Sequence, residues 1–474
     1  MAKLLFIQNI EFEFLGPMYI SAFVGSAHEC RMVIGSHAKD FELVMETFKP
    51  DVVGFPVMTG QHRWALECCR ELKKRYSFIA AFGGPHATFF PEIIDNDAVD
   101  IVCRGEGEEA VKDLLDAIAA GGEYSSIANF WVKKKGEIHK NDVRRLKDEL
   151  DAMPFPDRTL YSSTRAGNDT SIQKIITSRG CPFQCSFCFE ESMRELYRGK
   201  GSYVRVRSVD NVIAELRLIQ QAAHPRVFYF CDDVFGVNKK WLYSFLEIYK
   251  KEIGQEFICL VRADIVASDP DYARKLKDAG CKNVFFGIET GSEHLRNEIL
   301  RKNLRDHDIY AAATQLHEAG LKFRAYNIIG LPDETVEDAY KTLEMNIAIK
   351  TDYPWCSLFT PYPRTALAEY AIEKGCLDPG FSADTLSQSF FIDSPLRLKD
   401  RGQIENIQKF FQTAVLWPAA LPIIKLLVHL PPNIFFRLWF GLIYFYTYLK
   451  SEHRSLWQTT LFALRNFSSV IAKG

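Results

Sequence analysis

Three cysteines near the middle of the chain constrain this sequence more than any other feature. Cys181, Cys185 and Cys188 stand at C-x3-C-x2-C spacing, directly after the β-branched run 175–177, which predicts a strand. A loop at the end of a strand can direct three thiols at one inorganic group. Thiolates are the usual ligands of iron–sulfur clusters, and a four-iron cluster has four corners. Three cysteines therefore leave one iron free to bind something other than protein.

The alternatives for these thiols are a structural zinc site or three unrelated buried cysteines. Structural zinc usually takes four protein ligands, and no fourth cysteine or histidine lies close by in the sequence. The spacing therefore favours a [4Fe-4S] cluster, with Cys181, Cys185 and Cys188 as its ligands.

Length and charge narrow the class of protein further. A chain of 474 residues is long enough for two or three domains, and its net charge of −2 gives no reason to expect nucleic acid as a partner. The twelve cysteines are mostly scattered singly, as expected in a reducing compartment. The first residues lack the features of a signal peptide and predict a strand. We therefore expect a cytoplasmic globular protein.

The cysteine motif resembles that of the radical S-adenosylmethionine (SAM) superfamily. In that superfamily the open iron chelates the amino and carboxylate groups of SAM, and electron transfer cleaves SAM to a 5′-deoxyadenosyl radical. Phe187, the aromatic residue before the third cysteine, also matches the superfamily's pattern, where it lies near the adenine. The resemblance implies SAM as a cofactor and an external electron donor such as a flavodoxin or ferredoxin.

Residues 1–140 alternate short apolar runs with amphipathic segments, which predicts an α/β domain. Strand–helix alternation at this spacing indicates a doubly wound, Rossmann-like parallel sheet, whose ligands bind beyond the carboxyl ends of the strands. The expected strands are Leu4–Ile7, Arg31–Ile34, Val52–Pro56, Phe78–Phe82 and Val99–Cys103, and the expected helices include Phe41–Phe48 and Arg63–Arg75.

Glycine-containing loops follow three of these strands and resemble the cobalamin-binding domain of B12-dependent radical SAM enzymes. No Asp-x-His-x-x-Gly motif occurs, so the resemblance implies a cobalt without the histidine ligand of that motif. His86 follows a Gly-Gly-Pro turn and is expected to have a loop role against the corrin edge, with direct cobalt ligation as the alternative. A sheet that has lost cobalamin also stays open. The expected cobalamin contacts are Met58, Thr59, Gly83, Gly84, His86, Gly105 and Glu106.

Residues 141–170 interrupt the alternation with prolines at 154 and 156, which predicts a linker. The alternation returns over 171–375 with six strand–helix units, too few for a closed eightfold barrel. Six units match the partial (β/α)6 barrel of radical SAM proteins, with chemistry at the carboxyl ends of the strands. The expected strands are Lys174–Thr177, Arg226–Cys231, Phe257–Val261, Val284–Gly287, Arg324–Ile329 and Ser357–Thr360.

Charged residues at these strand ends match places where the superfamily contacts SAM. Asp232 and Asp233 are expected to bind the SAM ammonium, because charge-assisted hydrogen bonds are strong. Arg262 is expected to pair with the SAM carboxylate. Glu289, in a stretch similar to the family's Gly-Ile-Glu-Ser-Gly, is a further expected contact, and Asn327 lies on the strand that passes the adenine. The alternative for each charge is an ion pair with a neighbour at the barrel end.

Two positions depart from the family's pattern. Asp333 and Arg364 stand where relatives usually have glycine, and we expect them to reshape loops near the substrate. Cys356 beside the sixth strand is a candidate reactive thiol, but a buried structural cysteine is commoner.

Residues 376–474 predict a helical region, with apolar segments Leu416–Leu430 and Ile434–Leu449 separated by two prolines. A bilayer span needs about 20 apolar residues, so these segments are too short to cross a membrane. Two alternatives remain. One is a buried helix that caps the barrel or the cobalamin crevice, and the other is an interfacial segment lying on a membrane.

Together these patterns favour a cobalamin-dependent radical SAM enzyme that removes hydrogen from an unactivated carbon and delivers a methyl group from methylcobalamin. The substrate is expected to be a small or lipid-like molecule. No catalytic residue is assigned beyond the cluster ligands. The alternatives are a radical SAM cyclase or another C–C bond-forming or oxidative enzyme without net methylation, and a non-catalytic cobalamin sensor. The cysteine triad argues against the sensor, which needs no cluster.

Overall fold

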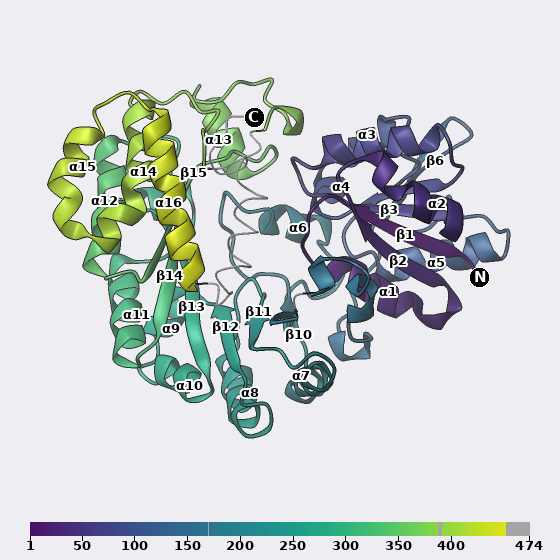
Figure 1. The fold of residues 1–474 in the computed structure, drawn as a ribbon, viewed down its shortest axis with the longest axis horizontal. Helices are drawn as coiled ribbons and strands as arrows, with labels where there is room; N and C mark the ends of the chain where they lie inside the picture. Colours follow the sequence, from purple (N-terminus) through teal and green to yellow (C-terminus); the bar gives the residue numbers. More distant parts are fainter. Residues whose placement is uncertain (169, 387–390, 452–474) are drawn as a thin grey trace. The chain divides into compact units, whose positions relative to one another are not determined.

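A computed structural model describes residues 1–168, 170–386 and 391–451, which fall into two compact units (Figure 1). Unit 1 comprises 1–172 and 192–225, and unit 2 comprises the described residues of 173–191 and 226–474. Helix α7 (Val209–Ala223) thus belongs with the N-terminal unit by its contacts, although its place in the sequence lies within the predicted barrel.

Unit 1 is built on a seven-stranded sheet in the order β2-β1-β3-β4-β5-β6-β7. The pairs among the first five strands are parallel, and β6 and β7 add an antiparallel hairpin at one edge. This confirms the predicted doubly wound sheet. The strands are β1 (Lys3–Gln8), β2 (Glu29–Ile34), β3 (Val52–Pro56), β4 (Ile79–Gly83), β5 (Ile101–Cys103), β6 (Phe130–Lys134) and β7 (Glu137–Lys140).

Two apolar cores cover the two faces of this sheet. Helices α2 (Glu42–Phe48), α3 (His62–Lys73) and α4 (Pro85–Phe89) contribute to one core, and α1 (Leu15–Val24) and α5 (Glu108–Ala119) contribute to the other. Strand β3 shows why both faces are covered, because four of its five residues are buried. A parallel strand covered on both faces has this nearly continuous apolar pattern.

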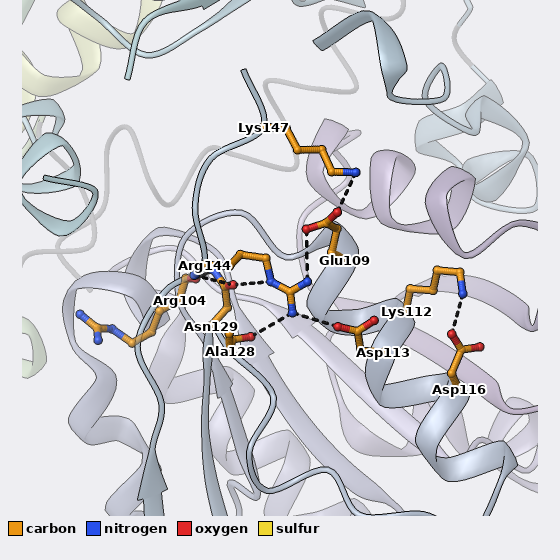
Figure 2. A network of polar contacts seen from close by, with 9 residues as sticks. All are labelled: Arg104, Glu109, Lys112, Asp113, Asp116, Ala128, Asn129, Arg144 and Lys147. Atoms are coloured by element: carbon orange, nitrogen blue, oxygen red, sulfur yellow. Dashed lines mark hydrogen bonds and ion pairs between the residues drawn. The ribbon is translucent and has the colours of Figure 1, made fainter. Parts of the chain in front are cut away.

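Arg144 in the predicted linker makes several contacts with helix α5 and its surroundings in unit 1 (Figure 2). The guanidinium of Arg144 donates to Glu109 at 3.2 Å and to Asp113 at 3.0 Å, both on α5, and to the side-chain oxygen of Asn129 at 3.0 Å. Lys147 adds a second contact to Glu109, at 2.7 Å. These contacts hold the segment after β7 along the edge of unit 1.

Unit 2 contains a six-stranded sheet in the order β15-β14-β13-β12-β11-β8. The pairs from β11 to β15 are parallel, and β15 and β8 stand at opposite ends, so the described strands form an open, partial barrel as predicted. The strands are β8 (Ile172–Ile175), β11 (Val227–Phe230), β12 (Glu256–Leu260), β13 (Cys281–Glu289), β14 (Lys322–Ile329) and β15 (Tyr353–Leu358).

Both faces of this sheet carry buried side chains. Residues such as Phe228, Cys259 and Phe286 are fully buried beneath the helices, whereas Tyr326 and Trp355 on the other face are half-buried. The face of Tyr326 and Trp355, which also carries the buried residues Val227, Ile258 and Phe285, is the barrel interior. The helices of unit 2 up to residue 373 are α8 (Lys239–Glu252), α9 (Ala263–Ala267), α10 (Tyr272–Asp278), the π-helix η7 (Leu295–Ile299), α11 (Asp306–Glu318), α12 (Val336–Ala348) and α13 (Ala366–Glu373).

Helix α14 (Arg401–Leu416) closes the exposed edge of β15. Gln408 and Gln412, one helical turn apart, donate their side-chain amides to the backbone carbonyls of Cys356 and Pro354, each at 2.9 Å. These bonds satisfy backbone groups that an edge strand leaves unpaired. Cys356 is buried beneath the helix, and burial raises the pKa of its thiol well above the usual value. Its environment is that of a structural cysteine.

The last described helices are α15 (Leu421–Leu427) and α16 (Ile434–Ser451), which pack with α14. The predicted segment Leu416–Leu430 is thus interrupted, because Pro418 starts a short 3-10 turn after α14. The buried face of α16 confirms in part the prediction of a helix that covers the barrel, with Tyr444 contacting Trp355 at a ring distance of 5.4 Å. Among the described residues, no helix has the length and apolar content needed to cross a bilayer.

Candidate active site

The cysteine motif lies in the loop after β8, which includes the two-residue strand β9 (Ser178–Arg179) and leads to helix α6 (Glu190–Leu196). All three cysteines are half-buried and form no disulfide. The loop folds back on itself, because the backbone N–H of Cys188 donates to the carbonyl of Cys185 at 3.0 Å, and that of Cys181 donates to the Glu190 carboxylate at 2.9 Å. The start of α6 thus braces the first cysteine.

Asp232, at the end of β11, anchors the start of this loop. Its buried carboxylate accepts from the backbone N–H of Thr177 at 3.0 Å, from the Thr177 hydroxyl at 2.7 Å and from the Ser178 hydroxyl at 2.5 Å. Burial raises the pKa of Asp232, while these hydrogen bonds oppose that rise. Because its oxygens are engaged by the loop, Asp232 acts as a positioning residue rather than as an open carboxylate.

The middle of the loop is fixed by Ser186. Its hydroxyl donates to the Ile299 carbonyl at 2.6 Å, and its backbone N–H donates to the Leu300 carbonyl at 3.0 Å. Its own carbonyl accepts from the N–H of Leu367, at the start of α13. Phe187 packs into an apolar cluster at the same end of the barrel, which includes Leu300 and Leu331. The loop between the cysteines is therefore held on both sides.

Arg262, after β12, lies against the same loop. Its guanidinium stacks over the ring of Phe183 at 3.6 Å, donates to Asp264 at 3.0 Å and donates to the Lys302 carbonyl at 2.9 Å. Arg262 is buried, and both Arg262 and Lys302 oppose the rise that burial causes in the pKa of the Cys185 thiol. Two cations therefore lie where they favour the thiolate of Cys185.

Glu289 occupies a bulge at the end of β13. The register with β14 shifts between Gly287 and Glu289, and Glu289 has a φ of 69°, a strained value for a residue with a side chain. Lys302 donates to its carboxylate at 2.5 Å, within a buried pair. A Cβ atom on Gly287 would meet the Glu289 oxygen at 2.0 Å and Lys302 Nζ at 2.7 Å. Glycine is required at position 287 because a side chain would collide with the ion pair. Lys302 is a site residue that the sequence did not reveal.

Asp233 differs from its neighbour Asp232 in its surroundings. Its side chain is exposed, and within the described part of the chain it makes no side-chain hydrogen bond. Desolvation by the surrounding protein raises the pKa of the Asp233 carboxyl to about 7, and the negative charges of Glu190 and Asp232 add to this rise. Asp233 is therefore the carboxyl at this strand end that is open to a ligand.

Asn327 lies near the end of β14, and Glu334 lies in the loop that follows this strand. Asn327 is fully buried, and its side chain donates to the Trp355 carbonyl at 2.9 Å and exchanges hydrogen bonds with Asn346. It therefore holds β14 to β15 and α12, and its side chain is not presented to a ligand.

Glu334 accepts from the N–H groups of Gly330 and Leu331 through one oxygen, and its buried Oε1 has no hydrogen-bond partner in the described residues. Sequence analysis did not single out Glu334.

The two departures from the family's glycines adopt left-handed backbone. Asp333 has a φ of 63° and Arg364 a φ of 70°, which explains why glycine is favoured at these positions. The Tyr370 hydroxyl donates to Asp333 at 2.5 Å, and Lys374 Nζ lies 3.7 Å from the same carboxylate. These contacts hold the Asp333 side chain against Tyr370 and Lys374.

In unit 1, the loops after β3 and β4 are joined to each other. The N–H of Val57 donates to the Gly83 carbonyl, and the N–H of His86 donates to the Val57 carbonyl. Gly84 has a φ of 91°, and a Cβ there would meet that carbonyl oxygen at 3.0 Å. Glycine at 84 is therefore needed for the close approach of the two loops, and Met58 is exposed on the first of them.

His86 is buried between these loops. Its ring stacks on His62 at 3.9 Å and on Phe90 at 5.0 Å, and its Nδ1 lies 3.3 Å from the Thr59 hydroxyl. This arrangement fits the predicted loop role. It does not present the ring as a ligand for cobalt.

The loop after β5 is held by the segment that follows the cysteine motif. The Tyr197 hydroxyl accepts from the Glu106 N–H at 2.8 Å, and the buried Arg205 forms an ion pair with the half-buried Glu106 carboxylate. Gly105 has a φ of 71°, and a Cβ there would lie 1.9 Å from the Tyr197 hydroxyl oxygen. Tyr197 and Arg205 were not predicted, because nothing in the sequence pairs 197–205 with 105–106.

We expect Gly105→Ala to lower the free energy of unfolding by about 2 kcal/mol, through left-handed backbone strain and displacement of Tyr197. Gly121→Ala is the matched control, because Gly121 also has positive φ but a methyl group there would have no other atom within 4 Å. Thermal unfolding of both variants measures the difference. Equal destabilisation of the two would contradict the proposed contact with Tyr197.

The cysteine loop carries the thiol donors that a four-iron cluster needs. Within residues 1–168, 170–386 and 391–451, no three His, Cys, Asp or Glu side chains come close enough together to hold one metal ion. In a four-iron cluster each thiolate binds a different iron. Three half-buried thiols on one braced loop, with cations beside Cys185, are a donor set suited to a cluster.

Fold and site together define an enzyme with a radical SAM barrel and a B12-binding domain. The sequence matches the Radical SAM superfamily over residues 175–345 and the B12 binding domain over residues 12–115. The chain belongs to the cobalamin-binding branch of the radical SAM superfamily, and its cofactors are a [4Fe-4S] cluster, SAM and cobalamin.

Particular relatives support this assignment. An uncharacterised methyltransferase of Pyrococcus horikoshii is 30% identical over 371 residues, which cover 77% of this chain and 79% of the relative. The anaerobic magnesium-protoporphyrin IX monomethyl ester cyclase of Rubrivivax gelatinosus is 23% identical, over 67% of this chain and 58% of the cyclase. The cobalamin-dependent radical SAM enzyme OxsB, solved with aqua-cobalamin and SAM bound, has the same fold, with a TM-score of 0.70 at 14% identity over 98% of this chain and 75% of OxsB.

Proposed function

We propose that the protein is a cobalamin-dependent radical SAM C-methyltransferase. The observation that carries the proposal is the combination, in one chain, of a B12-binding domain with a barrel whose first strand leads into C-x3-C-x2-C. When bound, the cluster supplies the electron that cleaves SAM, and methylcobalamin supplies the methyl group.

The chain's own residues hold and orient these groups. We assign the cluster to Cys181, Cys185 and Cys188, with Lys302 and Arg262 favouring the thiolate of Cys185. Asp233 is the carboxyl that receives the SAM ammonium, because Asp232 is engaged by Thr177 and Ser178.

Other contacts to SAM remain part of the proposal. Arg262 is assigned to the SAM carboxylate, and Glu289 and Phe187 to the wall of the SAM site. The orphaned Oε1 of Glu334 supports a hydrogen-bonding group of the ligand at the end of β14. Cobalamin is assigned to the loops after β3, β4 and β5, with Met58, Thr59, Gly83, Gly84, Gly105 and Glu106 as contacts.

The substrate side of the proposal is an apolar molecule of small or lipid-like type. Tyr229, Leu260, Tyr326 and Trp355 are half-buried on the interior face of the barrel, where their apolar surfaces favour such a ligand. An external flavodoxin- or ferredoxin-like protein is the proposed electron donor. The proposed location is the cytoplasm, with peripheral contact to a membrane through the C-terminal helices.

Incubation with SAM carrying a deuterated methyl group tests the reaction type. We expect the reduced enzyme to form 5′-deoxyadenosine and to pass the labelled methyl group to a carbon of the product, as detected by mass spectrometry. The similarity to a protein named as a cyclase supports a second candidate function, which is radical chemistry without net methylation. Formation of 5′-deoxyadenosine and an unlabelled product would support that second function and would contradict methyl transfer.

A further inference from the structure

The surface of the C-terminal helices is unusually apolar. Ten of the seventeen exposed large apolar side chains in the described residues lie between Trp417 and Tyr446. Five of them form what we call the apolar stripe of α16: Phe435, Leu438, Trp439, Leu442 and Tyr446. Helix α15 exposes two more, Ile423 and Leu426, which are 62% and 73% exposed.

The apolar stripe occupies one exposed face of α16, and another face of the same helix is buried. Its members are spaced by one, three or four residues, so they occupy a single arc of the helix. Phe440, Ile443 and Thr447 form the buried face, which packs toward the rest of unit 2. Phe435 remains 76% exposed and Leu442 60% exposed. The exposed stripe is therefore additional to the apolar face that the fold itself uses.

Charge around the stripe indicates what binds it. From Asn406 to Ser451 the sequence contains no aspartate or glutamate, although the whole chain has 60 acidic residues. The charged side chains of α15 and α16 are the cations Lys425, Arg437 and Lys450. Lys425 contacts Glu344 on α12 at 3.3 Å, an exposed pair that salt screens. An apolar surface whose own helices carry cations but no acids complements an anionic lipid surface.

The aromatic residues fit the same occupant. Trp417 lies 6.3 Å from the ring of Tyr446, and Trp439 donates its indole N–H to Thr413 at 2.9 Å while remaining 41% exposed. Tryptophan and tyrosine favour the boundary between headgroups and hydrocarbon. A second copy of this chain is a poorer occupant, because facing α15–α16 surfaces would bring like charges together without acids of their own.

We infer that the apolar stripe of α16, together with the exposed apolar residues of α15, binds the surface of an anionic bilayer. The helices lie on the bilayer rather than crossing it, with the stripe inserted among the headgroups and Lys450 directed to phosphate. Membrane binding and methyl transfer are measured by separate assays, so either can fail without the other.

Flotation of the full-length protein with vesicles tests this inference. We expect binding to vesicles of phosphatidylcholine with phosphatidylglycerol, weaker binding to phosphatidylcholine alone, and weakening with added salt. The double variant Phe435→Glu/Leu442→Glu is expected to bind at least about tenfold more weakly. Leu43→Glu on α2 and Leu218→Glu on α7 are matched controls, because both leucines are more than half exposed in unit 1.

Three results would overturn the inference. The first is no flotation with either vesicle type, which would leave the stripe to another occupant such as residues 452–474. The second is equal binding by the double variant and the wild type. The third is a dimer in solution that the double variant dissociates, without vesicle binding, which would assign the stripe to a second copy. Circular dichroism confirms that each variant is folded before its binding is compared.

Discussion

Replacing Cys185 by serine is expected to abolish reductive SAM cleavage and to reduce the iron content of the anaerobically purified protein below about one atom per chain, because a cluster held by two thiolates is not retained. The loop itself should survive, since Ser186 and Asp232 hold it through contacts that do not involve the Cys185 sulfur. Iron quantification and 5′-deoxyadenosine formation measure the two effects. Serine at 181 or 188 should act in the same way.

Cys376→Ser is the matched control, because Cys376 is another half-buried free cysteine of unit 2 that lies outside the motif. It should keep the iron content and SAM cleavage of the wild type. Full iron in the Cys185 variant would contradict the assignment of this thiol as a ligand.

Asp232→Ala is expected to have the second largest effect. It would leave the N–H and hydroxyl of Thr177 and the hydroxyl of Ser178 without their buried acceptor. Buried donors without partners are costly, so we expect a loss of about 3 kcal/mol in the free energy of unfolding. The start of the cysteine loop would loosen as well, and the iron content should fall. Urea unfolding and iron quantification provide the two readouts.

The neighbouring variant Asp233→Asn separates anchoring from ligand binding. Because Asp233 makes no side-chain hydrogen bond in the described residues, this variant should keep its stability and iron while binding SAM more weakly. If Asp233→Asn lost iron and Asp232→Ala kept it, the roles assigned to the two carboxylates would have to be exchanged.

Much of the architecture could be predicted because its signal is local. Apolar runs of four to six residues between amphipathic segments marked most of the strands, and Val52–Pro56 has the predicted bounds. The sixth barrel strand was predicted at Ser357–Thr360 but spans Tyr353–Leu358. The start of this strand was missed because it contains Pro354, and proline is uncommon within strands. Proline is tolerated there because β15 is an edge strand, whose outward side does not need an N–H donor.

Contacts between distant residues could not be predicted from periodicity. The pattern gave Asp232 and Asp233 the same role, but only the fold shows that one carboxylate is engaged by Thr177 while the other is exposed. Likewise, Asn327 has a polar side chain at a strand end, yet it serves the packing of β14 against α12. Lys302 was missed because its partner, Glu289, is brought to it by a bulge rather than by a sequence motif.

The C-terminal helices show a similar limit. Apolar segments were recognised, but their two sides could not be assigned before α14 was known to cover β15. One face of α16 packs within unit 2, whereas another face of the same helix remains exposed at the surface. The buried face of α16 corresponds to the first alternative considered from the sequence, and the exposed face is the surface on which the membrane alternative depends.

Metal analysis of the anaerobically purified full-length protein tests the central claim most directly. If three cysteines hold a cluster with one open iron and unit 1 holds cobalamin, iron and sulfide should each reach about four per chain and cobalt about one per chain. Zinc at one per chain in place of iron would contradict the account, because a zinc site cannot deliver the electron that cleaves SAM.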